Sequence, residues 1–170
     1  MEKDINYYMN EAVKEAKKAF EDNEVPIGCI IVYKDEVIAK SFNKRNTKKN
    51  TLYHAEIIAI DEACKFLGDW RLEGCTMYVT VEPCPMCAGA VLQSRIDRLV
   101  FGTYNKKAGC CGSIYNLLDD DRFNHKVKVE SGVMEDECTR LMKDFFKKTR
   151  DKNSIECKVL DSYSDYQKKE

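Results

Sequence analysis

Residues 76–93 read TMYVTVEPCPMCAGAVLQ, and this stretch decides the fold. Its first six residues are rich in β-branched side chains and alternate in polarity, which predicts a strand over 76–81. Pro83 ends that strand, and residues 84–93 show the apolar spacing of a helix. A strand that passes directly into a helix is the repeating unit of layered α/β domains.

The rest of the chain continues this alternation of short strands and helices. The predicted helices are 4–22, 54–67, 114–118 and 135–150, and the predicted strands are 29–33, 37–39, 98–102 and 127–129. The polar stretch 43–51 and the glycine-rich stretch 109–112 are expected to be loops. We therefore expect an α/β domain in which helices pack on both faces of one sheet.

The length of 170 residues is typical of one domain that needs no disulfide bonds to hold its core. We place this domain at residues 1–150. Residues 151–170 are charged and polar apart from Ile155, Val159 and Leu160, so we expect a frayed or mobile tail.

Composition excludes several classes of protein. Lys and Arg total 28 against 29 Asp and Glu, so any surface for nucleic acid must be local rather than global. No stretch approaches the roughly 18 apolar residues needed to cross a bilayer, and residues 1–10 lack a signal-peptide core. Nine cysteines is an odd number, so reduced thiols in a cytoplasmic protein are expected, with no membrane partner.

Two short motifs bring metal-binding residue types to predicted helix starts. His54-Ala55-Glu56 opens one helix, and the pair Cys84 and Cys87 opens another. One imidazole and two thiolates give zinc three protein ligands and leave a fourth position for water, which is the catalytic arrangement. Glu56 lies two residues from the histidine ligand, where a carboxylate can move protons. His125 is the other histidine of the chain, and it has no cysteine at metal spacing.

A Cys-x-x-Cys motif alone would also fit a redox pair or a structural zinc site. Its combination with His-x-Glu, in this chain order, is the established signature of zinc-dependent nucleobase deaminases. The combination favours one catalytic Zn²⁺ per chain with Glu56 as the acid/base group. A structural zinc knuckle is the alternative.

Longer segments resemble one family almost from end to end. The matching segments are 24–28, Asn43, 54–56, 79–90, 94–96, 101–102 and 123–125. Through them the chain resembles the bacterial tRNA-specific adenosine deaminases of the TadA type. The resemblance implies a cytidine deaminase-like three-layer α/β/α sandwich with a five-stranded mixed sheet. It also implies a homodimer, and a substrate that is the wobble adenosine of an arginine tRNA.

The resemblance assigns roles residue by residue. It makes His54, Cys84 and Cys87 the zinc ligands and Glu56 the acid/base group. Asn43 would hydrogen-bond to the flipped base, and Ile27 would line the base pocket. An amide can donate and accept at once on a purine edge, although asparagine is also a common turn former.

The resemblance also places RNA contacts in the second half of the chain. The candidates are Asn105, Lys107, His125, Phe145, Phe146 and Arg150. They offer stacking faces, hydrogen-bonding groups and positive charge for phosphates. Without the resemblance, the two phenylalanines would more often be core residues and the lysine part of a solvated face.

Asn105 departs from the family pattern, in which an aspartate is usual. An asparagine keeps one acceptor oxygen for a ribose 2′-hydroxyl and loses the negative charge that repels phosphate. We therefore expect looser discrimination between RNA and DNA, with ordinary sequence variation as the alternative.

Two other functions use the same motifs. The chain could deaminate free cytosine, cytidine or guanine, or it could be a catalytically silent, zinc-stabilised RNA-binding module. The motif alone does not separate the substrates, whereas the retained Glu56 argues against the silent module.

Overall fold

The computed structural model describes the backbone of residues 3–167 and the side chains of residues 3–153. The helices are α1 (Ile5–Glu21), α2 (Arg45–Lys48), α3 (Ala55–Leu67), α4 (Pro85–Gln93), the 3₁₀ helix η1 (Leu117–Asp119) and α5 (Glu135–Gln167). The strands are β1 (Gly28–Tyr33), β2 (Glu36–Phe42), β3 (Cys75–Val81), β4 (Arg98–Thr103) and β5 (Lys128–Glu130). In this part of the chain, no helix is both long enough and apolar enough to cross a membrane.

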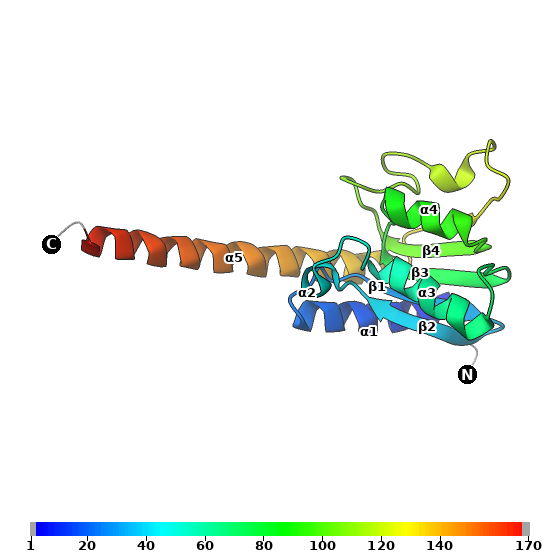
Figure 1. Ribbon diagram of the computed structural model, residues 1–170, viewed down its shortest axis with the longest axis horizontal. Helices are drawn as coiled ribbons and strands as arrows, with labels where there is room; N and C mark the ends of the chain where they lie inside the picture. Colours follow the sequence, from blue (N-terminus) through cyan, green and yellow to red (C-terminus); the bar gives the residue numbers. More distant parts are fainter. Residues whose placement is uncertain (1–2, 168–170) are drawn as a thin grey trace.

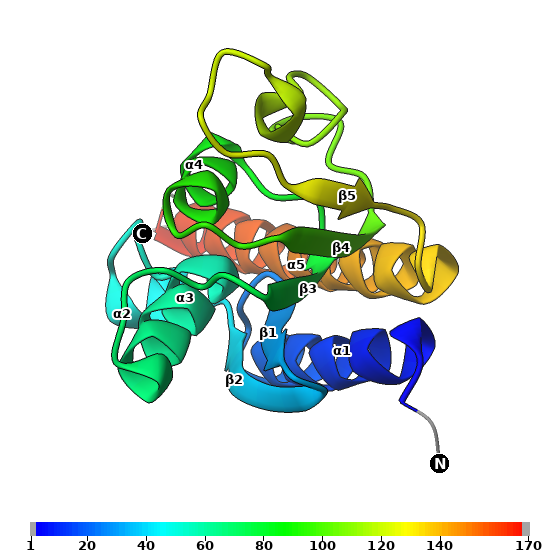
Figure 2. The ribbon, with the colours of Figure 1, turned by 90° about the vertical axis from the view of Figure 1, so that its right-hand side faces the viewer.

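The five strands form one mixed sheet in the order β2-β1-β3-β4-β5; Figure 1 labels the first four, and Figure 2 shows β5 beside β4. β1 pairs antiparallel with β2 and with β3, whereas β3, β4 and β5 run parallel. Because β3 and β4 are parallel, their carboxyl ends meet at one edge of the sheet. The predicted mixed five-stranded sheet is confirmed.

Side chains of the central strands point alternately into two apolar cores, one on each face of the sheet. Met77 and Phe101 join the core under α3 and α4, and Tyr78 and Val100 join the core under α1 and α5. Figure 2 shows these two helix pairs on opposite sides of the sheet. The predicted α/β/α layering is therefore confirmed.

Local signals fix where several elements begin. The side chain of Asp4 caps α1 by accepting a hydrogen bond of 2.8 Å from the backbone N–H of Tyr7. Gly28 begins β1 where the strand crosses α1, and a Cβ at this position would overlap the carbonyl oxygen of Ala12. The strand can approach the helix this closely only because residue 28 has no side chain.

Three elements differ from the sequence expectation. In place of the helix expected over 114–118, the structure has only the 3₁₀ helix η1 (Leu117–Asp119). Residues 43–51, expected as a loop, contain the short helix α2, because buried Glu24 accepts a hydrogen bond from the backbone N–H of Thr47. The last helix continues past Arg150 to Gln167 and extends away from the sheet (Figure 1). Residues 136–167 contain neither proline nor glycine, so the sequence offers no strong helix stop there. The mobility of the tail remains a prediction.

Candidate active site

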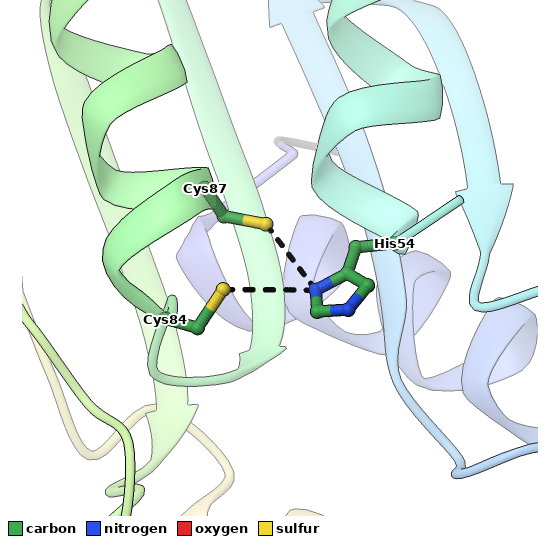
Figure 3. A group of neighbouring side chains, drawn as sticks. All are labelled: His54, Cys84 and Cys87. Atoms are coloured by element: carbon green, nitrogen blue, oxygen red, sulfur yellow. Dashed lines mark hydrogen bonds between the residues drawn. The ribbon is translucent and has the colours of Figure 1, made fainter. Parts of the chain in front are cut away.

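The site lies where the amino-terminal ends of α3 and α4 approach each other beneath one face of the sheet. His54 is the N-cap residue of α3, and Cys84 is the N-cap residue of α4 with Pro85 directly after it. Both cap residues have extended backbone, so each side chain projects beyond its helix rather than along it. Cys87 reaches the same point from the first turn of α4. Figure 3 shows the imidazole and the two thiols converging.

The distances among these three side chains match a tetrahedral zinc site. His54 Nδ1 lies 3.6 Å from Cys84 Sγ and 3.5 Å from Cys87 Sγ, and all three ligand atoms lie within 4.8 Å of one another. Zn–S bonds of about 2.3 Å and Zn–N bonds of about 2.0 Å at tetrahedral angles separate nitrogen and sulfur by about 3.5 Å. The donor set therefore fits zinc both in chemistry and in spacing.

Glu56 lies beside this cluster in the first turn of α3. Its side chain is 3% exposed, and its Oε2 atom is buried without a hydrogen-bond partner. Burial is the main reason why the pKa of this carboxyl group is raised to about 7, with the Cys84 thiolate adding to the shift. A buried, unpartnered carboxylate oxygen next to a zinc donor set is suited to hold and release a proton.

The two cysteines titrate as a pair. The hydrogen bond from the Cys87 thiol, with a further contribution from His54, lowers the pKa of Cys84 to about 4. The same hydrogen bond, together with burial and the nearby Glu56, raises the pKa of Cys87. The hydrogen bond with Cys84 raises the pKa of His54. The cluster thus already stabilises one thiolate, and a divalent cation would favour the second.

A cleft of about 1390 Å³ opens over Glu56, His54 and Cys84. One face of α5 forms a wall of this cleft, and the segment 103–108 forms another. Five basic residues line it, namely Arg45, Lys106, Lys107, Lys143 and Arg150. A local basic surface therefore exists in a chain whose formal net charge is −1.

Asn43 and Ile27 line the cleft together with His54 and Cys84, where the family resemblance places the base pocket. Asn43 is 5% exposed, and its amide donates to the carbonyl of Val25 at 3.3 Å. Its Oδ1 atom accepts from the backbone N–H of Arg45 at 3.2 Å. The side chain therefore shapes the start of α2 as well as facing the cleft.

Four of the candidate RNA contacts also line the cleft: Asn105, Lys107, Phe146 and Arg150. Phe146 is 44% exposed. The Oδ1 atom of Asn105 accepts hydrogen bonds from the backbone N–H groups of Lys107 and Ala108, at 3.3 and 3.1 Å. The oxygen that was expected to meet a ribose is thus already used to form a turn.

The structure places the other two candidates outside the residues that line the cleft. Phe145 is 7% exposed and packs edge to face against Phe20, with ring centroids 5.9 Å apart. His125 forms a hydrogen bond of 2.8 Å between its Nε2 atom and the carbonyl oxygen of Ile96. RNA contacts by these two side chains remain predictions.

Several cleft residues were not predicted from the sequence, among them Arg45, Lys143 and Glu82. Arg45 and Lys143 lie in polar stretches that resemble any solvated surface. Glu82 is 1% exposed between β3 and α4, and a charged residue directly after an apolar strand is a signal that could have marked it. Its partners come from a loop later in the chain, so sequence alone did not reveal its contacts.

The chain combines an α/β/α sandwich with a His/Cys/Cys donor set and a buried glutamate at two helix starts. This combination is that of the deaminases whose active site is suited to zinc. A model of the MafB19-like deaminase family matches residues 3–150. The tRNA-specific adenosine deaminase of Bacillus subtilis (strain 168) is 54% identical over 153 residues, which cover 90% of this chain and 95% of the relative.

Two further comparisons agree. The tRNA-specific adenosine deaminase of Aquifex aeolicus (strain VF5) is 46% identical over 144 residues, or 85% of this chain and 95% of the relative. A solved structure from work on A-to-I editing by tRNA:A34 deaminases is 39% identical, with a TM-score of 0.77, and the match covers 79% of this chain and 98% of the other. The chain belongs to the MafB19-like deaminases and, within them, groups with the tRNA-specific adenosine deaminases.

Proposed function

We propose that this protein converts adenosine to inosine at the wobble position of a tRNA anticodon by zinc-dependent hydrolytic deamination. The observation that carries the proposal is the spacing of His54, Cys84 and Cys87 beside the unpartnered oxygen of Glu56. The identity to tRNA-specific adenosine deaminases over nearly the whole chain supports the choice of substrate.

We assign the metal ligands to His54 Nδ1 and to the Sγ atoms of Cys84 and Cys87, with one ion per chain. When bound, zinc supplies a Lewis acid that makes water nucleophilic near neutral pH. The described residues offer three donors here, which is the ligand number of catalytic rather than structural zinc sites.

Glu56 performs the proton transfers. Its Oε2 atom takes a proton from the attacking water and passes it to a ring nitrogen as the water oxygen bonds to the amine-bearing carbon. It then carries the remaining proton of that oxygen to the amine, and the C–N bond breaks to release ammonia. A pKa raised to about 7 by burial suits a group that must both accept and donate near neutral pH.

The cleft supports a substrate larger than a free base. Its volume of about 1390 Å³ exceeds the roughly 300–1,000 Å³ that is usual for small-molecule pockets. The basic residues of the cleft can neutralise phosphates. Asn43 and Ile27 line the same cleft as Glu56, and we propose that they contact the reacting base. We further propose an arginine tRNA as the substrate, a homodimer as the assembly and the cytoplasm as the compartment.

A direct assay tests the proposal. The purified protein is incubated with an arginine tRNA anticodon stem-loop and, separately, with free adenosine, cytidine, cytosine and guanine. Mass analysis that detects inosine in the RNA alone supports the tRNA activity. Uridine, uracil or xanthine formed from the free compounds would instead establish a small-molecule deaminase.

Glu56→Ala separates an enzyme from a silent RNA-binding module. The variant should retain zinc and bind the stem-loop, because Glu56 is not assigned as a metal ligand, and it should lose turnover. General acid–base catalysis contributes about 10²- to 10⁴-fold, so a variant that keeps the wild-type rate contradicts the assignment.

A further inference from the structure

We propose that Glu82 is a positioning residue that fixes loop 105–113 as a wall of the substrate cleft. Glu82 follows β3 and lies two residues before the metal-ligand candidate Cys84. It is 1% exposed, so its side chain is almost fully buried at the base of the cleft. This inference rests on the proposed function, because it assigns the wall to binding of the RNA.

The carboxylate of Glu82 is held entirely by groups of this one loop. Oε1 accepts hydrogen bonds from the backbone N–H groups of Cys111 and Ser113, at 3.0 and 2.9 Å. Oε2 accepts from the backbone N–H of Asn105 at 2.9 Å and from the Ser113 hydroxyl. Backbone amides from both ends of the loop therefore converge on one buried anion, which is a strong way to fix a loop.

The backbone of the same segment strengthens the connection. Pro83 accepts a hydrogen bond of 2.9 Å from the backbone N–H of Cys110, and Glu82 donates one of 2.9 Å to the carbonyl of Thr103. Gly109 packs so closely that a Cβ there would overlap Glu82 Oε2. The loop is thus in direct contact with the peptide that leads to Cys84.

The fixed loop faces the substrate. Asn105, Lys106, Lys107 and Ser113 line the cleft, and two of these side chains carry positive charge. Holding them relative to Cys84 sets the position of phosphate-binding charge relative to the reacting base. The expected role of Glu82 is therefore in binding of the RNA rather than in the chemical step.

Glu82→Gln tests this role with little change in shape. In either orientation, the new NH₂ group would face a backbone N–H of the loop, so donor would oppose donor. We expect faster hydrogen exchange in peptides covering residues 104–113. We also expect KM for the anticodon stem-loop to rise about tenfold or more, with kcat within about threefold and zinc retained.

The matched control is Glu15→Gln, which changes another buried glutamate that pairs with Lys18 on α1 and does not line the cleft. It should leave both KM and exchange of the loop unchanged. Ser113→Ala removes one of the four hydrogen bonds, so it should shift both readouts in the same direction by about threefold. Because Ser113→Ala is a smaller change, it tests the role of Glu82 if Glu82→Gln does not fold.

Three results would overturn the inference. Unchanged exchange over residues 104–113 would mean that Glu82 does not hold the loop. Faster exchange with unchanged KM would mean that the loop does not position RNA, and loss of zinc would place the effect at the metal. If wild-type protein forms no inosine in RNA, the proposed function is wrong. Hydrogen exchange over residues 104–113 would still test whether Glu82 holds the loop.

Discussion

The neighbouring residues Phe145 and Phe146 should respond in opposite ways to replacement by alanine. Phe145 is 7% exposed and packs against Phe20 of α1, whereas Phe146 is 44% exposed and lines the cleft. Removing a buried phenylalanine costs about 3–5 kcal/mol, because both transfer energy and packing are lost. Stacking of a base on an exposed aromatic ring contributes about 1–3 kcal/mol to binding of single-stranded nucleic acid.

These magnitudes give separate expectations for two assays. At about 2–4 °C per kcal/mol, Phe145→Ala should lower Tm by about 6–20 °C and leave KM of the folded enzyme nearly unchanged. Phe146→Ala should raise KM for the stem-loop by about 5- to 150-fold, since each 1.4 kcal/mol is tenfold, with Tm changed by little. Each variant serves as the control for the other, because both remove the same ring from adjacent positions of α5.

The decisive measurements are thermal unfolding, followed by circular dichroism, and steady-state deamination of the stem-loop. The reasoning is refuted if Phe146→Ala unfolds at a much lower temperature than wild type while KM stays constant. It is equally refuted if Phe145→Ala keeps the wild-type Tm and loses affinity for RNA.

Three further predictions concern the metal, the core and pH. Chelation of zinc should abolish deamination, and added Zn²⁺ should restore it in wild type but not in Cys87→Ser, as measured by activity and metal content. Gly28→Ala should destabilise the fold by about 2 kcal/mol or more in urea unfolding, because its Cβ would overlap the carbonyl of Ala12. Gly89→Ala is the control and should cost less, because a Cβ at this position of α4 meets no atom within 4 Å. The Arg98 guanidinium lowers the pKa of Glu130. Glu130→Gln should therefore cost about 1 kcal/mol at pH 7, and the difference should disappear as pH falls below the lowered pKa; a constant difference down to pH 2 would contradict it.

The metal cluster could be predicted from the sequence because its geometry is largely local. Cys84 and Cys87 lie on the same helical turn, and His54 and Cys84 each cap a helix whose apolar pattern is clear. Only the approach of the two helix starts depends on the tertiary fold. The alternating strands likewise indicated a sheet covered on both faces.

The walls of the cleft could not be predicted in this way. Whether Phe145 or Phe146 faces the core depends on α1, which supplies Phe20 from the opposite end of the chain. The carboxylate of Glu82 meets groups that lie 23 to 31 residues later in the sequence. Neither contact produces a periodic pattern in the amino-acid sequence. For this reason the family resemblance placed buried Phe145 in one group with residues that line the cleft.

The three candidate metal donors come from the starts of two helices, and Cys84 follows His54 by 30 positions in the sequence. An unfolded chain has no reason to bring them together, so tight binding of an ion would require folding, and a bound ion would in turn hold the two helix starts in place. The amount of bound metal would then report on the folding of the whole domain. A substitution far away in the core of α3 or α4 would be detected first as protein purified with less than one ion per chain.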